Sequence, residues 1–470
     1  MSLKPLQMNI RARFSTFIFC VLPFCIAAQG YYNQENFGNR SILLSGNVTG
    51  SVDDLGLTYY NPARLALIED PVFTINAKAY QFSTLNLKNV FGREGKISDT
   101  KFEGVPSLIA GTFKIEKWKK HHFAYAFLSK ERSRFNFNIN REVNTDDLGG
   151  DFGENDRLVG DYQLDNKRTD EWFGLSWGMQ LRDNLSIGVS TFVSIYNYSS
   201  LYDLRFAADF EDSGVDTFSN KIKFGQNSYG LFWKLGLAWE LDKIELGLNV
   251  DFPYLEVIGD GKFQYQRYLS GLDPEEEDFR FYDFENLETS RKVPMGISLG
   301  IGWPFGKNKL HFKADWHGEV KEYDRLVIPP LEDGEEGFVF SESLRSVINF
   351  GVGAEFYINE KFNIYGSFST DFSPIRSSAN VFDLINNEER DANFDADYMH
   401  YGLGFDVKLK KLKLVLGTTY TTASGDFSDP IDFPFGDVPI NEDPSSIVLN
   451  RWRFIVGLEI PLFGYDLEFK

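Results

Sequence analysis

The most constraining feature of this sequence is a run of alternating apolar and polar residues between Leu231 and Phe252. Apolar side chains occupy every second position on both sides of Asp242-Lys243, and charged residues, amides and glycine hold most positions between them. A period of two is typical of β-strands, so the run predicts two antiparallel strands joined by a tight turn. Each strand has about ten alternating residues, the length of a tilted strand that crosses the hydrocarbon layer of a membrane.

The same alternation recurs along the chain and predicts about fourteen strands. Short links such as Arg182 to Asn184 alternate with long links such as Ser200 to Ser228. This order is typical of an up-and-down barrel that has tight turns on the periplasmic side and long loops outside. An even strand count also leaves no sheet edge unpaired in lipid. The sequence therefore predicts an all-β fold, an antiparallel transmembrane β-barrel of about fourteen strands.

The beginning of the chain has the features of a secretory signal peptide, for which we predict the range 1–28. Basic residues precede an apolar run, Phe14–Ile26, and the small residues Ala27-Ala28 follow it. Both cysteines of the chain, Cys20 and Cys25, fall within this range. We therefore expect no disulfide and no thiol chemistry in the mature protein.

Composition excludes several classes of protein. A net charge of −20 is unfavourable for binding nucleic acid. No apolar stretch after the leader reaches the length of a membrane-spanning helix, whereas an aromatic content of 16% fits the lipid face and interfacial girdles of a barrel. The long links are acidic, as in Glu332–Glu336, and we interpret them as solvated loops. Divalent cations that bridge them to lipid head groups are the alternative, but no calcium-loop pattern is present, so no metal ligands and no cofactor are predicted.

Residues 29–70, between the leader and the first strand, do not alternate. Asn61-Pro62-Ala63 followed by Leu65 is typical of a turn that opens a short helix, with proline near the first helical position. The apolar residues of this segment need a buried environment. A lumen enclosed by about fourteen strands is too wide for side chains alone to fill, so we expect the segment to lie inside the barrel.

This segment resembles the corresponding part of the FadL-like outer-membrane transporters, the channels for long-chain fatty acids and aromatic hydrocarbons. The resemblance is carried by Asp53-Asp54, Tyr59-Tyr60, Asn61-Pro62-Ala63 and Leu65, and by their place just before the first strand. It implies a fourteen-stranded barrel in which the segment is a hatch, and a gap in the wall at a kink in the third strand. The third predicted strand breaks its alternation at Leu128-Ser129-Lys130, for which a plain β-bulge is the alternative explanation.

Candidate ligand contacts come from charged residues on the inward-facing positions of predicted strands. Lys78, Lys313 and Arg453 are cations that could hold a ligand carboxylate, and His317 shares the inward face with Lys313. The alternative is that each cation pairs with a lumenal aspartate or glutamate. Because a polar lumen needs such residues in any case, we predict no metal site and no acid–base site among them.

One motif typical of an enzyme is present, the G-x-S-x-G pattern of Gly296–Gly300. A nucleophile elbow needs a turn from a strand into a helix, whereas this copy lies within an alternating strand. Its small residues would instead leave room in the lumen for a plug or a ligand. We therefore predict no catalytic residues and no enzymatic activity.

Together these features predict a protein of the cell outer membrane with a hatch at 29–70, a barrel at 71–463 and a tail at 464–470. The expected function is passive uptake of a hydrophobic compound such as a long-chain fatty acid, through a pocket lined by Phe, Leu and Ile beneath the hatch. The expected partners are membrane lipid, a hydrophobic small molecule and other outer-membrane proteins. The alternative function is a non-transporting accessory barrel subunit of a secretion or assembly complex.

Overall fold

The computed structural model describes residues 32–68, 72–90, 93–101, 106–115, 117–118, 120–143, 157–210, 214–271, 277–330, 338–376, 381–383, 388–390, 396–410, 412–427 and 445–462. The predicted leader and tail lie outside these residues, as do most of the acidic loop sequences. Within the described part of the chain, no helix is long and apolar enough to cross a membrane.

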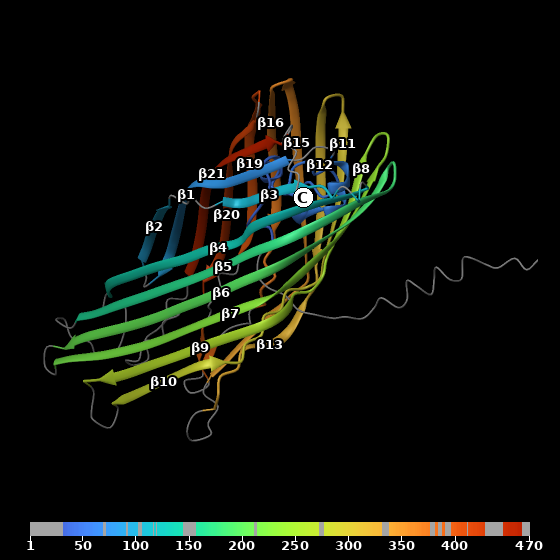
Figure 1. Cartoon of the computed structure of the whole chain (residues 1–470). Coiled ribbons are helices and arrows are strands. Elements are labelled where there is room, and N and C mark those ends of the chain that lie inside the picture. The colour runs from blue at the N-terminus through green and yellow to red at the C-terminus, as the bar shows by residue number, and fades with distance from the viewer. Residues whose placement is uncertain are drawn as a thin grey trace, which may run out of the picture.

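The structure consists almost wholly of β-strands (Figure 1). The helical elements are α2 (Arg40–Leu43), α3 (Leu57–Tyr60) and the 3-10 helix η1 (Pro62–Leu67). The strands are β1 (Val72–Val90), β2 (Arg93–Lys101), β3 (Pro106–Phe113), β4 (His121–Val143), β5 (Arg157–Arg182), β6 (Leu185–Phe210), β7 (Gly214–Glu240), β8 (Glu245–Asp251), β9 (Leu255–Ser270), β10 (Asp278–Leu287), β11 (Gly296–Phe305), β12 (Asn308–His317), β13 (Val320–Leu326), β14 (Phe338–Leu344), β15 (Val347–Asn359), β16 (Phe362–Asp371), β17 (Val381–Asp383), β18 (Glu388–Arg390), β19 (Asp397–Lys408), β20 (Lys413–Phe427) and β21 (Ser445–Pro461).

Fourteen of these strands form a closed antiparallel ring, in the order β1, β3, β4, β5, β6, β7, β8, β11, β12, β15, β16, β19, β20 and β21. The ring closes where β21 pairs with β1, from Val72 opposite Pro461 to Lys88 opposite Ser446. Each ring strand contains one of the predicted alternating segments, and the predicted short links join them. The predicted fold class is therefore confirmed.

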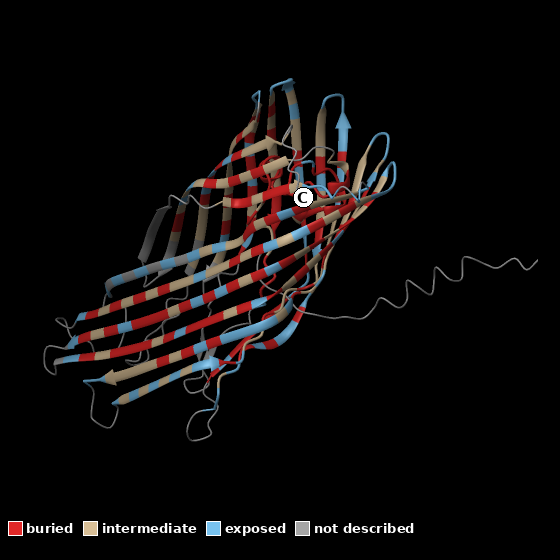
Figure 2. Ribbon diagram, viewed as in Figure 1, coloured by how far each residue is buried: buried red, intermediate tan, exposed pale blue. Residues whose placement is uncertain are grey.

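The outer surface of the ring is apolar. Leu175 on β5 is 62% exposed, Leu403 on β19 is 60% exposed and Phe454 on β21 is 48% exposed. Buried residues alternate with exposed and half-buried ones along the strands (Figure 2). Large apolar side chains on the outside of a closed sheet are what a lipid environment stabilises and water does not, so this surface fits a bilayer.

Several strands extend far beyond the length needed to cross a membrane. β5 has 26 residues, which is about 85 Å along the strand. β4, β5, β6, β7, β9 and β10 form a long sheet that leaves the ring on the side of the long links (Figure 1). The predicted long link from Ser200 to Ser228 is therefore mostly strand, since β6 continues to Phe210 and β7 begins at Gly214. That part of the loop prediction is wrong.

The apolar residues change faces along these long strands. In the ring, β6 turns the odd-numbered Val189 and Val193 outward, whereas in its outer half the even-numbered Tyr202, Leu204 and Phe206 are buried on the inner face. A water-exposed sheet buries its apolar face against other protein, and a lipid-exposed sheet turns it outward. The position along β6 where the apolar residues change from the outer to the inner face therefore marks where the sheet leaves the hydrocarbon layer of the membrane.

A small second sheet, β13–β14–β17–β18, covers part of the buried inner face. We call β13 and β14 the outer cap. The ring of Phe340 lies 4.4 Å from that of Phe224 on β7, measured between centroids. Arg325 of the cap is 2% exposed and donates to Gln226 Oε1 at 2.7 Å and to Tyr196 Oη at 2.7 Å. These contacts join the outer cap to the long sheet.

Candidate functional site

Residues 32–68, which we call the plug segment, lie inside the ring. The segment meets lumen-facing glycines on nine strands of the ring, β5, β6, β7, β8, β11, β15, β19, β20 and β21. A Cβ atom added to most of these glycines would collide with the backbone or side chains of the segment. At Gly178 and Gly353 the added atom would be in tight contact with the segment without a collision. The glycines that meet the segment are Gly178, Gly188, Gly236, Gly247, Gly300, Gly302, Gly351, Gly353, Gly402, Gly404, Gly417 and Gly457. Glycine is needed here because another backbone approaches the sheet closely.

The predicted hatch motif packs against β5, β6 and β7. Asn61 caps η1 by accepting a hydrogen bond from the backbone N–H of Ala63 at 3.2 Å, and Pro62 occupies the first position of the helix. The amide of Asn61 also donates to the carbonyl of Leu237 on β7 at 3.1 Å. Ala63 and Leu65 are fully buried. The motif therefore attaches the plug segment to the wall.

Charged residues within the plug segment are satisfied by its own backbone. Asp54 accepts hydrogen bonds from the Ser41 backbone N–H at 2.8 Å and from the Gly56 backbone N–H at 3.0 Å. Burial raises the pKa of Asp54 above its ordinary value. Arg64 donates to the carbonyls of Val52 and Gly50, at 2.6 and 2.9 Å. These bonds fix the fold of a segment that has little helix of its own.

Two of the predicted ligand contacts instead hold the plug segment. Lys78 on β1 forms an ion pair with Glu35 of the segment. Arg453 on β21 pairs with the same carboxylate at 2.5 Å and donates to Gln81 Oε1 at 2.8 Å. The alternative of pairing with an acidic residue is thus the one observed, although the acid belongs to the plug segment and not to the wall.

Two further ion pairs join the plug segment to the wall. Arg40 pairs with Glu355 on β15 at 2.8 Å. Arg64 pairs with Glu240 at the end of β7 at 3.1 Å. Both arginines are nearly fully buried, so the loss of either wall carboxylate would leave part of a buried positive charge uncompensated. Together with the Glu35 pairs, these contacts hold the segment at three places.

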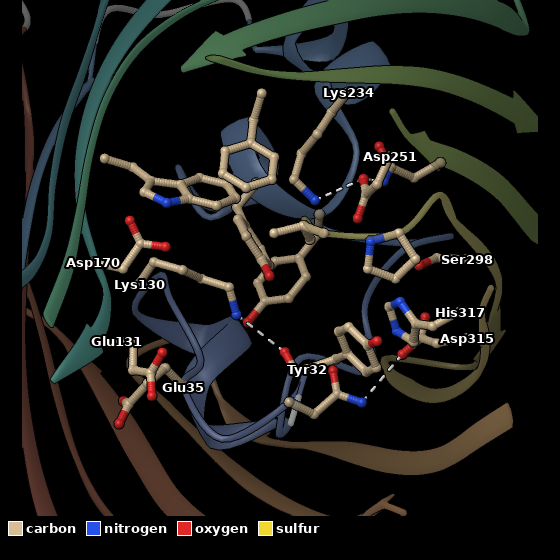
Figure 3. A pocket seen from close by; sticks show the side chains of 18 of the residues that line it. Tyr32, Glu35, Lys130, Glu131, Asp170, Lys234, Asp251, Ser298, Asp315 and His317 are labelled. Atoms are coloured by element: carbon tan, nitrogen blue, oxygen red, sulfur yellow. Dashed lines mark hydrogen bonds and ion pairs between the residues drawn. The ribbon is translucent and has the colours of Figure 1, made fainter. Parts of the chain in front are cut away.

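A cavity lies on the side of the plug segment that faces the long links. Gly236 and Gly247 contact the segment, whereas Lys234 and Asp251 of the same two strands line the cavity. Because Lys234 and Asp251 lie further along their strands from the short Asp242-Lys243 turn, the cavity is on the other side of the segment from that turn. The cavity is lined by aromatic and charged side chains from the segment and from β4, β5, β7, β8, β11 and β12 (Figure 3). They include Tyr32, Glu35, Tyr59, Tyr60, Lys130, Glu131, Arg168, Asp170, Trp172, Phe232, Lys234, Asp251, Phe252, Arg291, Lys313, Asp315 and His317.

The lining differs from the predicted one. No leucine or isoleucine is among the lining residues, and the aliphatic side chains are those of Val293 and Pro294. The rings of Trp172 and Phe232 stack with centroids 4.2 Å apart, and the Tyr254 ring continues the row at 4.7 Å from Phe232. This cavity therefore differs from the expected Phe, Leu and Ile pocket beneath the hatch, both in its aliphatic part and in its position.

The other two predicted contacts do line the cavity. Lys313 on β12 pairs with its neighbour Asp315 at 2.6 Å. His317, at the end of β12, stacks on Tyr32 with centroids 3.7 Å apart. Two more cations of the cavity, Lys234 and Arg291, also have carboxylate partners. Lys234 pairs with Asp251 at 2.7 Å.

Arg291 is the most extensively bound of these cations. It pairs with Asp170 at 2.6 Å and donates to Ser194 Oγ at 3.0 Å. Its guanidinium also lies 3.9 Å from the ring centroid of Tyr196. Since Arg325 of the outer cap donates to the same tyrosine, the cavity and the cap share this contact.

Lys130 and Trp172 are among the lining residues that sequence reasoning did not identify as ligand contacts. The predicted break in alternation is confirmed, because the β4–β5 register shifts between Ser129 and Glu131. Lys130 stands at this bulge and enters the cavity (Figure 3). The break itself was the available signal, since bulges commonly re-aim a side chain. Trp172 carried no such signal, because its parity opposes that of the lipid-facing residues of β5.

The G-x-S-x-G pattern lies within β11, as predicted, and not at a strand-to-helix turn. Gly300 faces Gly50 of the plug segment, which is the close approach that its small residues indicated. No cluster of three metal-ligating side chains occurs among the described residues.

Comparison with known proteins gives matches in structure and not in sequence. No family model and no curated protein sequence matches the chain. A FadL homologue of Pseudomonas aeruginosa is similar over 92% of this chain and 100% of its own, with a TM-score of 0.58 and 12% identity. The toluene transporter TodX of P. putida is similar over 91% of this chain and 99% of its own, with a TM-score of 0.55 and 10% identity.

A third similar structure is the monoaromatic hydrocarbon channel CymD. It covers 92% of this chain and 98% of its own, with a TM-score of 0.53 and 11% identity. At these identities the likeness concerns the fold, and it extends over nearly the whole length of each chain. Together with the closed fourteen-stranded ring, it confirms the predicted resemblance at that level: the chain has the fold of the FadL-like outer-membrane channels.

Proposed function

We propose that this protein is an outer-membrane channel for the passive uptake of a hydrophobic compound. A closed ring with an apolar outer surface supports the membrane location. Two of the similar structures are described as a toluene transporter and a monoaromatic hydrocarbon channel, which favours uptake over enzymatic activity and over the accessory-subunit alternative. The observation that carries the proposal is a partly open cavity inside the ring, lined by the plug segment and by strands of the wall.

The wall beside this cavity has a stretch without a partner strand. β4 pairs with β3 only from Phe123 to Leu128, although it pairs with β5 as far as Val143. Beyond the bulge, no described strand pairs with the other edge of β4. This stretch supports a lateral exit from the cavity, the route that the resemblance to the FadL-like transporters implies.

The plug segment would then act as the hatch. In our proposal, residues 29–70 form the hatch and 71–463 form the barrel. The segment fills the lumen between the cavity and the short turns, and the Glu35, Arg40 and Arg64 ion pairs hold it in place. A shift of this segment would change access to the cavity without opening the ring, because the strand pairs do not depend on it.

The test compares uptake by the full chain with uptake by a variant that lacks residues 32–66. Vesicles that contain each protein are mixed with radiolabelled ethylbenzene, and the label inside is measured over time. Faster entry than in protein-free vesicles, altered by the deletion, supports the proposal. Folding of the variant is checked by its heat-dependent mobility in a denaturing gel. If the deletion variant does not fold, Arg64→Gln is used, which removes the ion pair with Glu240 and the hydrogen bonds to the carbonyls of Val52 and Gly50.

A folded full-length protein that gives no more uptake than empty vesicles, for ethylbenzene and also for a long-chain fatty acid, would contradict the proposal. Recovery of the chain in a fixed ratio with other outer-membrane proteins, in the absence of uptake, would instead support the accessory-subunit alternative.

A further inference from the structure

Three cations of the cavity are paired with carboxylates, and Lys130 differs from them. Lys234, Arg291 and Lys313 each have a carboxylate within ion-pair distance. Lys130 has none within 4.0 Å in the described part of the chain, and its Nζ donates only to the backbone carbonyl of Tyr32 at 3.1 Å. A partly buried ammonium with a single neutral acceptor has unused hydrogen-bonding capacity.

A second donor beside Lys130 has no partner. Trp172 is 4% exposed, lines the cavity and has a buried Nε1 without a hydrogen-bond partner among the described residues. In the β4–β5 register Trp172 lies opposite Leu128, two residues from Lys130. Buried indole N–H groups usually find an acceptor. Lys130, with hydrogen-bonding capacity to spare, and Trp172, whose Nε1 has no acceptor among the described residues, therefore line the same cavity.

The acidic residues nearby do not satisfy these donors. Asp170 is occupied by Arg291 and by Ser194 Oγ, which donates to it at 2.6 Å. Glu131 accepts a hydrogen bond from Ser133 at 3.1 Å. Figure 3 shows Lys130, Glu131 and Asp170 on one side of the cavity, and Asp251, Asp315 and His317 on the other. The carboxylates present are thus engaged elsewhere.

The apolar part of the cavity is aromatic. The Tyr59 ring lies 6.0 Å from that of Trp172, between centroids, and Lys130 Nζ lies 5.4 Å from the Tyr59 centroid. The rings of Trp172 and Phe232, stacked on each other, also line this cavity. Flat aromatic surfaces favour a planar ring, whereas an alkyl chain has no aliphatic groove here.

We propose that the cavity selects an aromatic carboxylate, whose ring packs against Trp172, Phe232 and Tyr59 and whose anion is bound by Lys130 Nζ and Trp172 Nε1. This rests on the proposed uptake function and narrows its substrate class to molecules with both a ring and an acid group. Lys78 and Arg453, predicted for the acid group from the sequence, have Glu35 as their partner instead.

The test measures binding of 4-phenylbutyrate and of its neutral primary amide to the full chain in detergent, by calorimetry. The acid is expected to bind at least about tenfold more tightly than the amide, because a charge-assisted hydrogen bond replaces a neutral one. Lys130→Gln should remove most of this difference by weakening the acid alone. Lys130→Arg, which keeps the charge, should retain it.

The Trp172→Phe variant loses the indole N–H donor but keeps an aromatic ring, so it separates the contribution of the hydrogen bond from that of ring packing. It should weaken binding of the acid several-fold while leaving the amide within about twofold of the wild type. Lys262→Gln, at an exposed lysine of β9, is the control and should change neither ligand. The heat-dependent gel mobility of each variant shows that it has folded.

Equal binding of acid and amide, unchanged by Lys130→Gln, would overturn the anion site while leaving uptake of a neutral compound intact. Tighter binding of decanoate than of 4-phenylbutyrate would overturn the aromatic selectivity. Failure of the proposed function is distinguishable, because vesicles would then take up neither ethylbenzene nor a fatty acid.

Discussion

The imidazole ring of His317 lies parallel to the phenol ring of Tyr32, with centroids 3.7 Å apart and an angle of 9° between the planes. His317 ends β12, and Tyr32 begins the described plug segment. The backbone N–H of Tyr32 donates to Asp371 on β16 at 3.1 Å. This stack therefore contributes to holding the start of the described segment against the wall.

Replacing His317 with alanine should loosen this end of the plug segment. Loss of one stacked pair is expected to cost about 0.5–1.5 kcal/mol, with little effect on the barrel. Hydrogen exchange of residues 32–37 should become faster, while exchange in β12 and β16 stays as in the wild type. His317→Phe keeps a flat ring and serves as the control. Unchanged exchange in the alanine variant would show that the stack does not hold the segment.

Gly300→Ala should destabilise the contact between plug segment and wall. Its methyl group would overlap Gly50 and Thr49, so we expect a loss of about 1–3 kcal/mol from overpacking. Gly366→Ala on β16 is the matched control, because an added Cβ there meets nothing within 4 Å. The check is the midpoint of thermal unfolding by circular dichroism. A midpoint that falls equally for both variants would contradict this explanation.

Glu35→Gln should release the plug segment from β1 and β21. Lys78 and Arg453 would remain buried without the carboxylate that they share, a change that typically costs about 3–5 kcal/mol. We expect larger ion conductance in planar bilayers and faster protease cleavage of the segment. Glu319→Gln removes an exposed pair with Arg376 and should cost less than about 1 kcal/mol. Equal conductance of the two variants would exclude Glu35 as an anchor.

Arg325→Met should detach the outer cap while the ring stays closed. The guanidinium bonds to Glu342 at 2.8 Å as well as to Gln226 and Tyr196, so its loss leaves a buried carboxylate unpaired. Removing one partner of a buried pair costs about 3–5 kcal/mol. Hydrogen exchange should rise in β13 and β14 and not in β19 or β20. Arg157→Met, at an exposed pair with Glu142, should leave exchange unchanged.

The ring could be predicted because lipid imposes one rule on every strand that crosses it. Ile187 and Leu235 alternate with small or polar neighbours for this reason, and the short links separate the strands clearly. The long sheet could not be predicted by the same rule. Outside the bilayer, Tyr202 and Phe224 carry the apolar face on the opposite parity, so a search for outward apolar residues ends where the membrane ends.

The site was harder to predict because its partners are distant in sequence. Inward parity identified Lys78 and Arg453 as lumenal cations, but parity cannot show that Glu35, hundreds of residues from Arg453, reaches both. The cavity depends on how the plug segment folds, and that segment has no periodicity. Lys130 enters the cavity because the strand register shifts by one residue beside it. The sequence shows that the alternation breaks at this point, but it does not show to which side the Lys130 side chain turns.

The long sheet also determines what meets the protein first at the cell surface. With its ring in an outer membrane, β5, β6 and β7 would carry their far ends tens of ångströms past the lipid head groups, into the polysaccharide layer. Antibodies and phages would therefore encounter these strand ends before they reach the bilayer, and would contact a surface distant from the residues that bind cargo.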